Sequence, residues 1–125
     1  MTPELLRPLE SILNRNIAGS SRARGLLGQV AGRSMELRLS ATPLRLRFVA
    51  DAERVAILAG GEQPADAVIE GTPFALARLA LGDPAQSIRA GGAQVSGDAE
   101  IAQGFQKLFA AAQPDFEEEL SRLTG

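Results

Sequence analysis

Three side chains that could take part in acid–base or nucleophilic chemistry lie close together, at Ser96, Asp98 and Glu100. The 125 residues contain no histidine and no cysteine, so the commonest general base and a common nucleophile are missing, and a Ser–Asp or Glu–Glu arrangement remains possible for catalysis. The same absence removes the usual ligands of a structural zinc ion. Asp98 is better explained as a helix cap, because a helical pattern starts directly after it and no base stands beside it. We therefore expect no enzyme, no metal site and no cofactor.

The stretch that must position these side chains is a short strand that turns into an amphipathic helix, residues 93–112. Val95 is typical of a strand, and Gly97 followed by Asp98 ends the strand and starts the helix. Apolar residues then recur at spacings of three and four, which places them on one helix face. These residues are Ile101, Phe105, Leu108, Phe109 and Ala112. Two phenylalanines on this face need a deep apolar partner surface.

Short stretches of alternating apolar and polar residues predict strands that supply this surface. The predicted strands are residues 35–39, 44–48, 55–58, 66–70 and the strand that ends near Val95. The first two are joined by a tight turn at Thr42-Pro43 and should pair antiparallel. Glu36 and Arg38 would then face Arg45 or Arg47 on an exposed face, a contact worth a few tenths of a kcal/mol at most.

The first 32 residues predict one helix and a loop. Thr2-Pro3 is typical of a helix start, and Gly19 follows the end of the apolar pattern, although Pro8 lies inside it. Residues 22–32 contain three glycines and indicate a loop, with at most one helical turn docked on the core. The glycines do not match a phosphate-binding or dinucleotide-binding pattern, so we assign this segment no chemistry.

Further helices are expected in the second half of the chain. One begins at Thr72-Pro73, a helical turn is expected around 85–90, and Gln113-Pro114 should close the helix that Asp98 starts. Asp115 and Glu118 then form a capping box that opens a last helix. The order of elements predicts a single α+β domain over residues 1–125, with a five-stranded, mainly antiparallel sheet whose apolar face is covered by helices.

Charge is distributed unevenly along the chain. Residues 1–50 contain eight arginines and three glutamates, whereas residues 51–125 contain five basic and twelve acidic residues, for a net charge of −2. A basic half could attract phosphates or an anionic membrane surface, but solvated strand and loop positions are the favoured explanation of these arginines. Nucleic acid is not expected as a partner, because no basic run is interleaved with aromatic residues. Without a secretory signal pattern or a long apolar run, we expect a cytoplasmic protein.

Several phrases of the sequence resemble the sterol-carrier-protein type-two-like domain, and within it the UbiJ-like accessory factors of bacterial ubiquinone biosynthesis. The matching phrases are Leu26-Leu27-Gly28-Gln29-Val30, Leu44-Arg45-Leu46-Arg47-Phe48, Gly71-Thr72-Pro73, and Val95-Ser96-Gly97-Asp98 followed by Ile101, Phe105 and Leu108. The resemblance implies an apolar tunnel between sheet and helices that holds lipid. It further implies binding of polyprenyl quinone precursors on behalf of cytoplasmic ubiquinone enzymes.

The resemblance also implies one protein partner. UbiJ-like proteins usually continue with a helical segment that engages a UbiK-like coiled-coil partner, whereas this sequence stops at Gly125. Either the sequence is a piece of a longer chain or that partner function is absent here. A homo-oligomer and a peripheral membrane contact stay open as further interactions.

The lipid-binding wall is predicted from the apolar faces of the strands and helices. Its residues are Leu46, Phe48, Val55, Ile57, Phe74, Leu76, Leu79, Phe105, Leu108, Phe109, Phe116 and Leu120. Each of them is also an ordinary core residue, so only the whole set indicates a cavity. The alternative is a protein-interaction scaffold with a fully packed interior, which binds through its sheet face or exposed helix edges. A tunnel of several hundred Å³ would favour lipid, and a close-packed interior would favour the scaffold.

Overall fold

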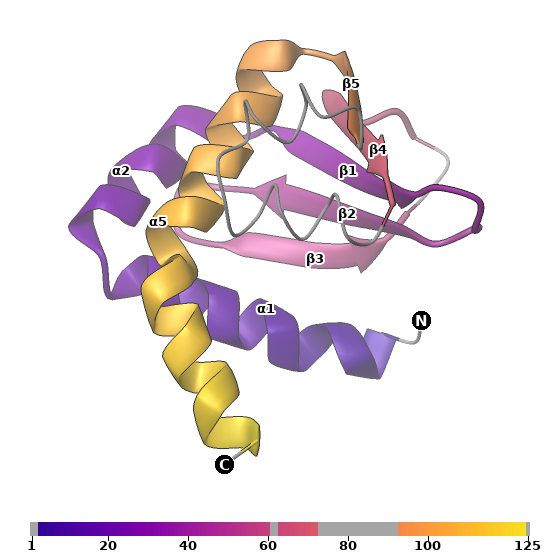
Figure 1. Ribbon diagram of the computed structural model, residues 1–125. Coiled ribbons are helices and arrows are strands. Elements are labelled where there is room, and N and C mark those ends of the chain that lie inside the picture. The colour runs from indigo at the N-terminus through magenta and orange to yellow at the C-terminus, as the bar shows by residue number, and fades with distance from the viewer. Residues whose placement is uncertain (1–2, 61–62, 73–92, 125) are drawn as a thin grey trace.

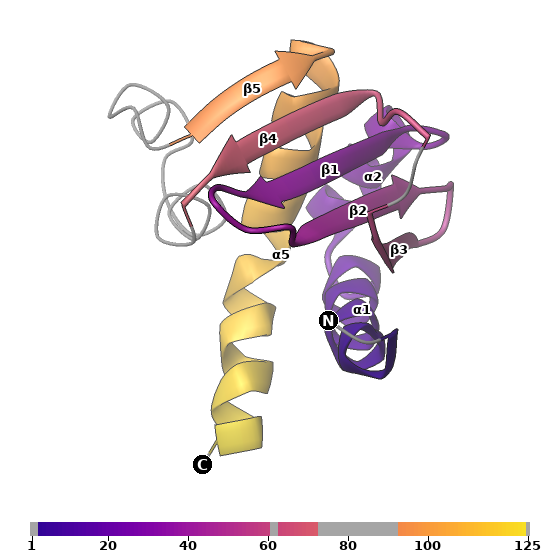
Figure 2. The ribbon, with the colours of Figure 1, turned by 90° about the vertical axis from the view of Figure 1, so that its right-hand side faces the viewer.

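The computed structural model describes residues 3–60, 63–72 and 93–124, with side chains described for 6–60, 63–72 and 93–112. Its helices and strands are α1 (Pro3–Ala18), α2 (Ser21–Val30), β1 (Ser34–Leu39), β2 (Arg45–Ala50), β3 (Val55–Ala59), β4 (Ala67–Gly71), β5 (Ala93–Gly97) and α5 (Ala99–Thr124). The strands form one five-stranded sheet in the order β3-β2-β1-β4-β5. Figures 1 and 2 show the described helices on one face of this sheet, which confirms the predicted α+β architecture.

Neighbouring strands of the sheet run antiparallel, except that the central strand β1 runs parallel to β4. Leu37 lies opposite Leu46 of β2 and opposite Ile69 of β4, so the apolar positions of three strands share one face. We call this the inner face, because the helices cover it. The other residues, Glu36 and Arg47 among them, form the outer face.

The core fills the space between the inner face and helices α1, α2 and α5. Phe48 lies between Met35 and Ile57 in the strand register, and its ring lies 5.0 Å from that of Phe109 on α5. The ring of Phe109 also lies 6.1 Å from that of Phe105, which is fully buried. The predicted apolar face of α5 is therefore the face that packs on the sheet, as tilted aromatic pairs favour.

Residues 21–30 form helix α2, so the prediction of a loop over residues 22–32 was wrong. Ser20 caps the helix, since its side-chain oxygen accepts a hydrogen bond from the backbone N–H of Ala23 at 3.1 Å. Leu27 and Val30 are buried in the core, and their burial offsets the low helix propensity of the glycines. Helix α2 packs on α5, where a Cβ at Gly104 would lie only 2.6 Å from Val30.

Helix α5 continues to Thr124, so the expected break at Gln113-Pro114 and the separate last helix from Asp115 were also wrong. A proline inside a helix removes one backbone hydrogen bond and disfavours the preceding turn by about 3 kcal/mol. Good helix formers on both sides of Pro114 offset this cost, as they do at Pro8 inside α1.

The junction between β5 and α5 confirms the predicted cap. Asp98 Oδ1 accepts hydrogen bonds from the backbone N–H groups of Glu100 at 3.0 Å and Ile101 at 3.2 Å. Gly97 before it has a φ of +78°, and a Cβ there would lie 2.6 Å from the carbonyl oxygen of Asp66. Both the backbone angle and the close approach require glycine at this position. The Gly-Asp pair is therefore structural.

Helix α1 runs beside the edge strand β3 and satisfies part of its backbone. Asn14 accepts a hydrogen bond from the N–H of Val55 at 2.7 Å and donates one to the carbonyl of Val55 at 2.8 Å. Glu10 accepts a hydrogen bond from the N–H of Ile57 at 3.0 Å and pairs with Arg54. An edge strand otherwise presents unpaired backbone groups that can pair with another chain, so these side chains protect the edge of the sheet at β3.

Candidate lipid-binding site

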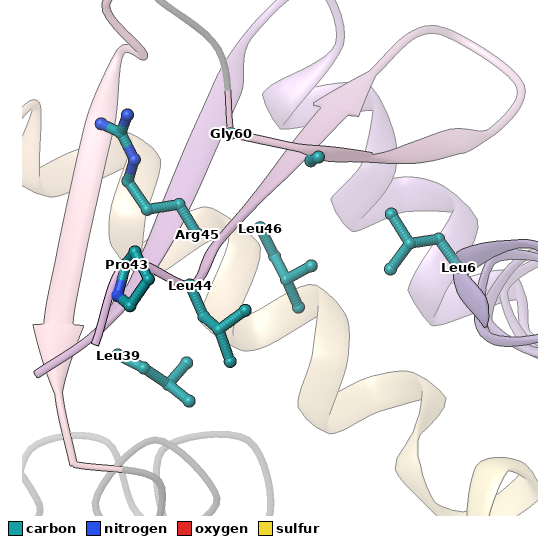
Figure 3. Close-up of a pocket in the computed structure, with 8 residues that line it drawn as sticks. Leu6, Leu39, Pro43, Leu44, Arg45, Leu46 and Gly60 are labelled. Atoms are coloured by element: carbon teal, nitrogen blue, oxygen red, sulfur yellow. The ribbon is translucent and has the colours of Figure 1, made fainter. Parts of the chain in front are cut away.

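A pocket lies at the end of the inner layer, where the turn between β1 and β2 and the end of β3 approach the start of α1. Its volume is about 220 Å³. The lining is mainly aliphatic and consists of Leu6, Leu39, Pro43, Leu44, Arg45, Leu46, Ala59 and Gly60. Figure 3 shows Leu39, Leu44 and Leu46 projecting to the same side of the hairpin, with Leu6 reaching toward them from α1. Such a lining suits a hydrocarbon group.

The turn between β1 and β2 positions two residues that line the entrance of this pocket, Leu39 and Leu44. The N–H of Leu39 donates a hydrogen bond to the carbonyl of Leu44 at 3.1 Å, which places these two lining residues opposite each other. Thr42 holds the turn through its hydroxyl, which donates to the carbonyl of Leu39 and accepts from the N–H of Leu44. Ala41 takes a left-handed φ of 63°, an uncommon conformation for a residue with a Cβ.

The predicted wall residues that the structure describes lie in one apolar layer, but most of them are packed against protein. Val55, Phe105 and Leu108 are fully buried, Phe48 and Ile57 nearly so, and Leu46 and Phe109 pack at the margin of the core. Of the members of the predicted set whose side chains are described, only Leu46 lines the pocket. The structure therefore brings the seven described members of the set together as a core.

Five predicted wall residues have no described side chain. Phe74, Leu76 and Leu79 lie outside the described residues, as do the helix expected after Thr72-Pro73 and the turn expected around 85–90. Phe116 and Leu120 lie on α5, beyond the part whose side chains are described. No tunnel is seen among the described side chains, and the tunnel with its twelve-residue wall stays a prediction.

The prediction missed most of the pocket lining, although the sequence held a signal for it. Leu6 continues the three-and-four spacing that leads through Leu9 and Leu13, and it is buried. Alternation places Leu39 and Leu44 on apolar strand faces, and their position beside the turn at Thr42-Pro43 is a further signal. Residues at the ends of apolar strands line the mouth of a sheet–helix layer, so the turn could have indicated them.

The centre of the outer face is an ion cluster around Glu36. Arg38 Nε lies 2.6 Å from one carboxylate oxygen of Glu36, Arg45 Nη1 lies 3.8 Å from that oxygen, and Arg47 Nη2 lies 3.5 Å from the other. The expected partners are correct, but the expected exposed face is wrong, because Glu36 is only 1% exposed. The arginine side chains lie over the carboxylate and shield it from water.

The surroundings of Glu36 favour its charged form. Burial acts to raise the pKa of the Glu36 carboxyl, but the hydrogen bond and charge of Arg38, the charge of Arg45 and the hydrogen bond from Arg47 outweigh it. The pKa of Glu36 therefore lies below its ordinary value. Arg47 is also held in place by donating to the carbonyl of Gln63.

The side chains first considered for chemistry do not form a catalytic arrangement. Asp98 is occupied as the cap of α5, and Ser96 and Glu100 are exposed. Over the described residues, acidic side chains do not gather into a group that could hold a metal ion. None of the described helices combines the length and hydropathy that a membrane-spanning segment needs.

Solved structures of known proteins share this fold. The solved structure named UbiJ-SCP2 ubiquinone synthesis protein has a TM-score of 0.76 and 22% identity, over 90% of this chain and 94% of that one. The sterol carrier protein domain 2 of Helicoverpa armigera has a TM-score of 0.62 and 13% identity, over 90% and 92% of the two chains. A crystal structure of sterol carrier protein 2 has a TM-score of 0.59 and 18% identity, over 82% and 92%. No curated protein matches the sequence significantly.

At these identities the solved structures show a common fold, whereas the family assignment comes from the sequence. Residues 9–110, most of the chain, match the SCP-2 sterol transfer family. This match confirms the resemblance that the motifs indicated. The chain belongs to the SCP-2 sterol transfer family.

Proposed function

We propose that the chain is a non-catalytic accessory module of ubiquinone biosynthesis, which holds polyprenylated quinone precursors for enzymes in the cytoplasm. The observation that carries the proposal is an aliphatic pocket at the open end of the apolar layer, in a chain of a sterol transfer family. The likeness of its fold to the UbiJ-SCP2 ubiquinone synthesis protein supports the choice of ligand class.

The size of the pocket suits part of a prenyl tail. Its volume of about 220 Å³ lies below the roughly 300–1,000 Å³ of most small-molecule sites. Each buried methylene contributes about 0.8 kcal/mol relative to water, but a tail in a bilayer is already in an apolar medium. Transfer from the bilayer to the pocket is therefore nearly neutral in free energy. Such a module presents a head group to soluble enzymes and leaves the rest of the tail in the membrane.

Native mass spectrometry of the purified chain with a polyprenylated phenol tests the proposal. We expect a one-to-one complex, which Ala59→Phe weakens because the ring fills the pocket from an exposed position at the end of β3. Ala52→Phe adds the same ring in the exposed turn before β3 and serves as the matched control. A chain that takes up no lipid, or that binds equally well after Ala59→Phe, contradicts the proposal.

A protein-interaction scaffold is the second candidate, and the density of the core favours it. The buried layer includes Phe105, Leu108 and Val55 with essentially no exposed surface. A close-packed interior leaves little room for a ligand. The same mass spectrometry separates the two functions, since a scaffold should copurify with no lipid and should bind none when lipid is added.

A further inference from the structure

The arginines of the outer face carry more positive charge than Glu36 neutralises. Arg38, Arg45 and Arg47 share this one carboxylate, so the cluster holds two positive charges in excess. The side chains of Arg38 and Arg45 are 42% and 43% exposed, so this excess faces water. Glu70 lies opposite Arg38 in the register of β1 and β4, on the side of the cluster away from Arg45. The excess charge is therefore concentrated toward Arg45.

Two exposed leucines lie next to these arginines on opposite sides of the sheet, Leu58 on the outer face and Leu44 on the side of the pocket. Leu44 is 39% exposed and directly precedes Arg45, and Leu58 is 49% exposed and lies opposite Arg47 in the register of β2 and β3. A single exposed leucine is ordinary on a protein surface. Two of them beside an excess of guanidinium groups make a surface that combines apolar and cationic contacts, which is the chemistry that binds the boundary of an anionic bilayer.

The pocket opens at this same place. Leu44 and Arg45 line it, and Figure 3 shows the guanidinium group of Arg45 directed away from the side to which Leu44 and Leu46 project. An arginine at the mouth can therefore contact a lipid phosphate while Leu44, on the pocket side, contacts acyl chains. Guanidinium groups suit phosphate because their donors match its oxygens in a planar fork.

We propose that Leu44, Leu58, Arg38 and Arg45 form a rim that docks on an anionic bilayer and brings the pocket to the acyl region. A prenyl tail could then pass between bilayer and pocket without crossing water. This inference rests on the proposed function, because it assigns the surface through which the ligand of that pocket arrives.

Cosedimentation of the chain with vesicles tests the rim. Vesicles of phosphatidylcholine alone are compared with vesicles in which phosphatidylserine replaces part of it. We expect binding to the anionic vesicles, weakened by salt, and Arg45→Gln should lower the partition coefficient about fivefold, since a basic residue near such a surface contributes about 1 kcal/mol. Leu58→Ser should lower binding by removing an inserted apolar group. Thermal unfolding checks that each variant is folded.

Arg22→Gln is the matched control for charge. Arg22 is exposed on α2. This helix lies at the end of the sheet opposite the turn between β1 and β2 (Figures 1 and 2). Its removal should change vesicle binding much less than Arg45→Gln does. Equal binding to neutral and anionic vesicles, or equal losses in the two variants, would overturn the rim. So would Arg45-dependent binding to poly-L-glutamate without vesicle binding, which would assign the surface to an acidic protein.

Lipid uptake from detergent solution separates this inference from the proposed function. Leu58 does not line the pocket, so Leu58→Ser should take up the polyprenylated phenol as the parent chain does while binding vesicles less. Uptake by the parent chain without vesicle binding contradicts the rim alone. Vesicle binding without uptake contradicts the proposed function and, with it, the role assigned to the rim.

Discussion

The two faces of the sheet are made from alternate residues of the same strands, yet they exclude water by different means. On the inner face, Phe48 and Ile69 are covered by helices and by the rings of α5. On the outer face, Glu36 is as buried as Ile69, but what covers it is a group of arginine side chains. A one-residue step along β1, from Met35 to Glu36, crosses from one arrangement to the other.

This difference predicts how each face responds to a change of conditions. Apolar burial is non-directional, roughly proportional to area and insensitive to protonation. The outer cluster depends on charge, on geometry and on each partner being present. Substitutions on the inner face should therefore have effects independent of pH and salt, whereas those at Glu36 should depend on both.

The largest expected effect is on the inner face. Phe105 is fully buried and its ring lies 6.1 Å from that of Phe109, so Phe105→Ala should lower the free energy of unfolding by about 4 kcal/mol. Urea unfolding measures this change, with Phe105→Leu as a milder comparison. A loss below about 1 kcal/mol would mean that the layer is loosely filled, which would favour a hollow interior.

Glu36→Gln is expected to have the largest effect on the outer face. It keeps the shape of the side chain but leaves three arginines without their shared carboxylate, so the free energy of unfolding should fall by about 2 kcal/mol. The loss should be smaller than for a fully buried ion pair because Arg38 and Arg45 are partly exposed. Glu70→Gln, an exposed carboxylate opposite Arg38, is the control and should change stability by less than about 0.5 kcal/mol. Equal effects would show that Glu36 behaves as a surface residue.

Asn14→Ala tests whether hydrogen bonds help to hold helix α1 against strand β3. The substitution removes both hydrogen bonds to the backbone of Val55, so we expect a loss of about 1 kcal/mol in unfolding free energy. Hydrogen exchange at the Val55 amide should become faster. Asn14→Asp keeps the acceptor for that amide, so it should preserve more of the protection. Unchanged exchange in Asn14→Ala would mean that α1 is held to β3 by apolar packing alone.

The fold followed from the sequence where one local rule dominated. The alternation in β1 and β2, the turn at Thr42-Pro43 and the cap at Asp98 all matched the structure. Prediction failed where tertiary burial overrode local propensity. Burial of Leu27 and Val30 makes a helix of a glycine-rich segment. At Pro114 the cause is local instead, because good helix formers on both sides carry α5 through the proline.

The site was less predictable, because apolar periodicity does not distinguish residues that line a lipid pocket from residues that pack in the protein core. Phe105 and Leu46 carry the same signal, but one is sealed in the core and the other lines the pocket. Glu36 shows a related difficulty, since alternation placed it on the polar face and said nothing of burial. Its burial depends on arginines from two strands meeting in register, which is a property of pairing.

The smallest expected effect is the pH dependence that the outer face adds. Because the pKa of Glu36 is lower in the folded chain than in the unfolded one, its contribution to stability is fully present above the unfolded pKa, about 4.3, and is lost as pH falls through the folded value. The stability difference between the parent chain and Glu36→Gln should therefore shrink as pH falls below about 4.3. Urea unfolding across this pH range measures the difference. The stability difference between the parent chain and Phe105→Leu should not change with pH. If the stability difference between the parent chain and Glu36→Gln grew in acid, the effect of burial on the pKa of Glu36 would outweigh that of the three arginines. Glu36 would then be protonated more readily in the folded chain than in the unfolded one.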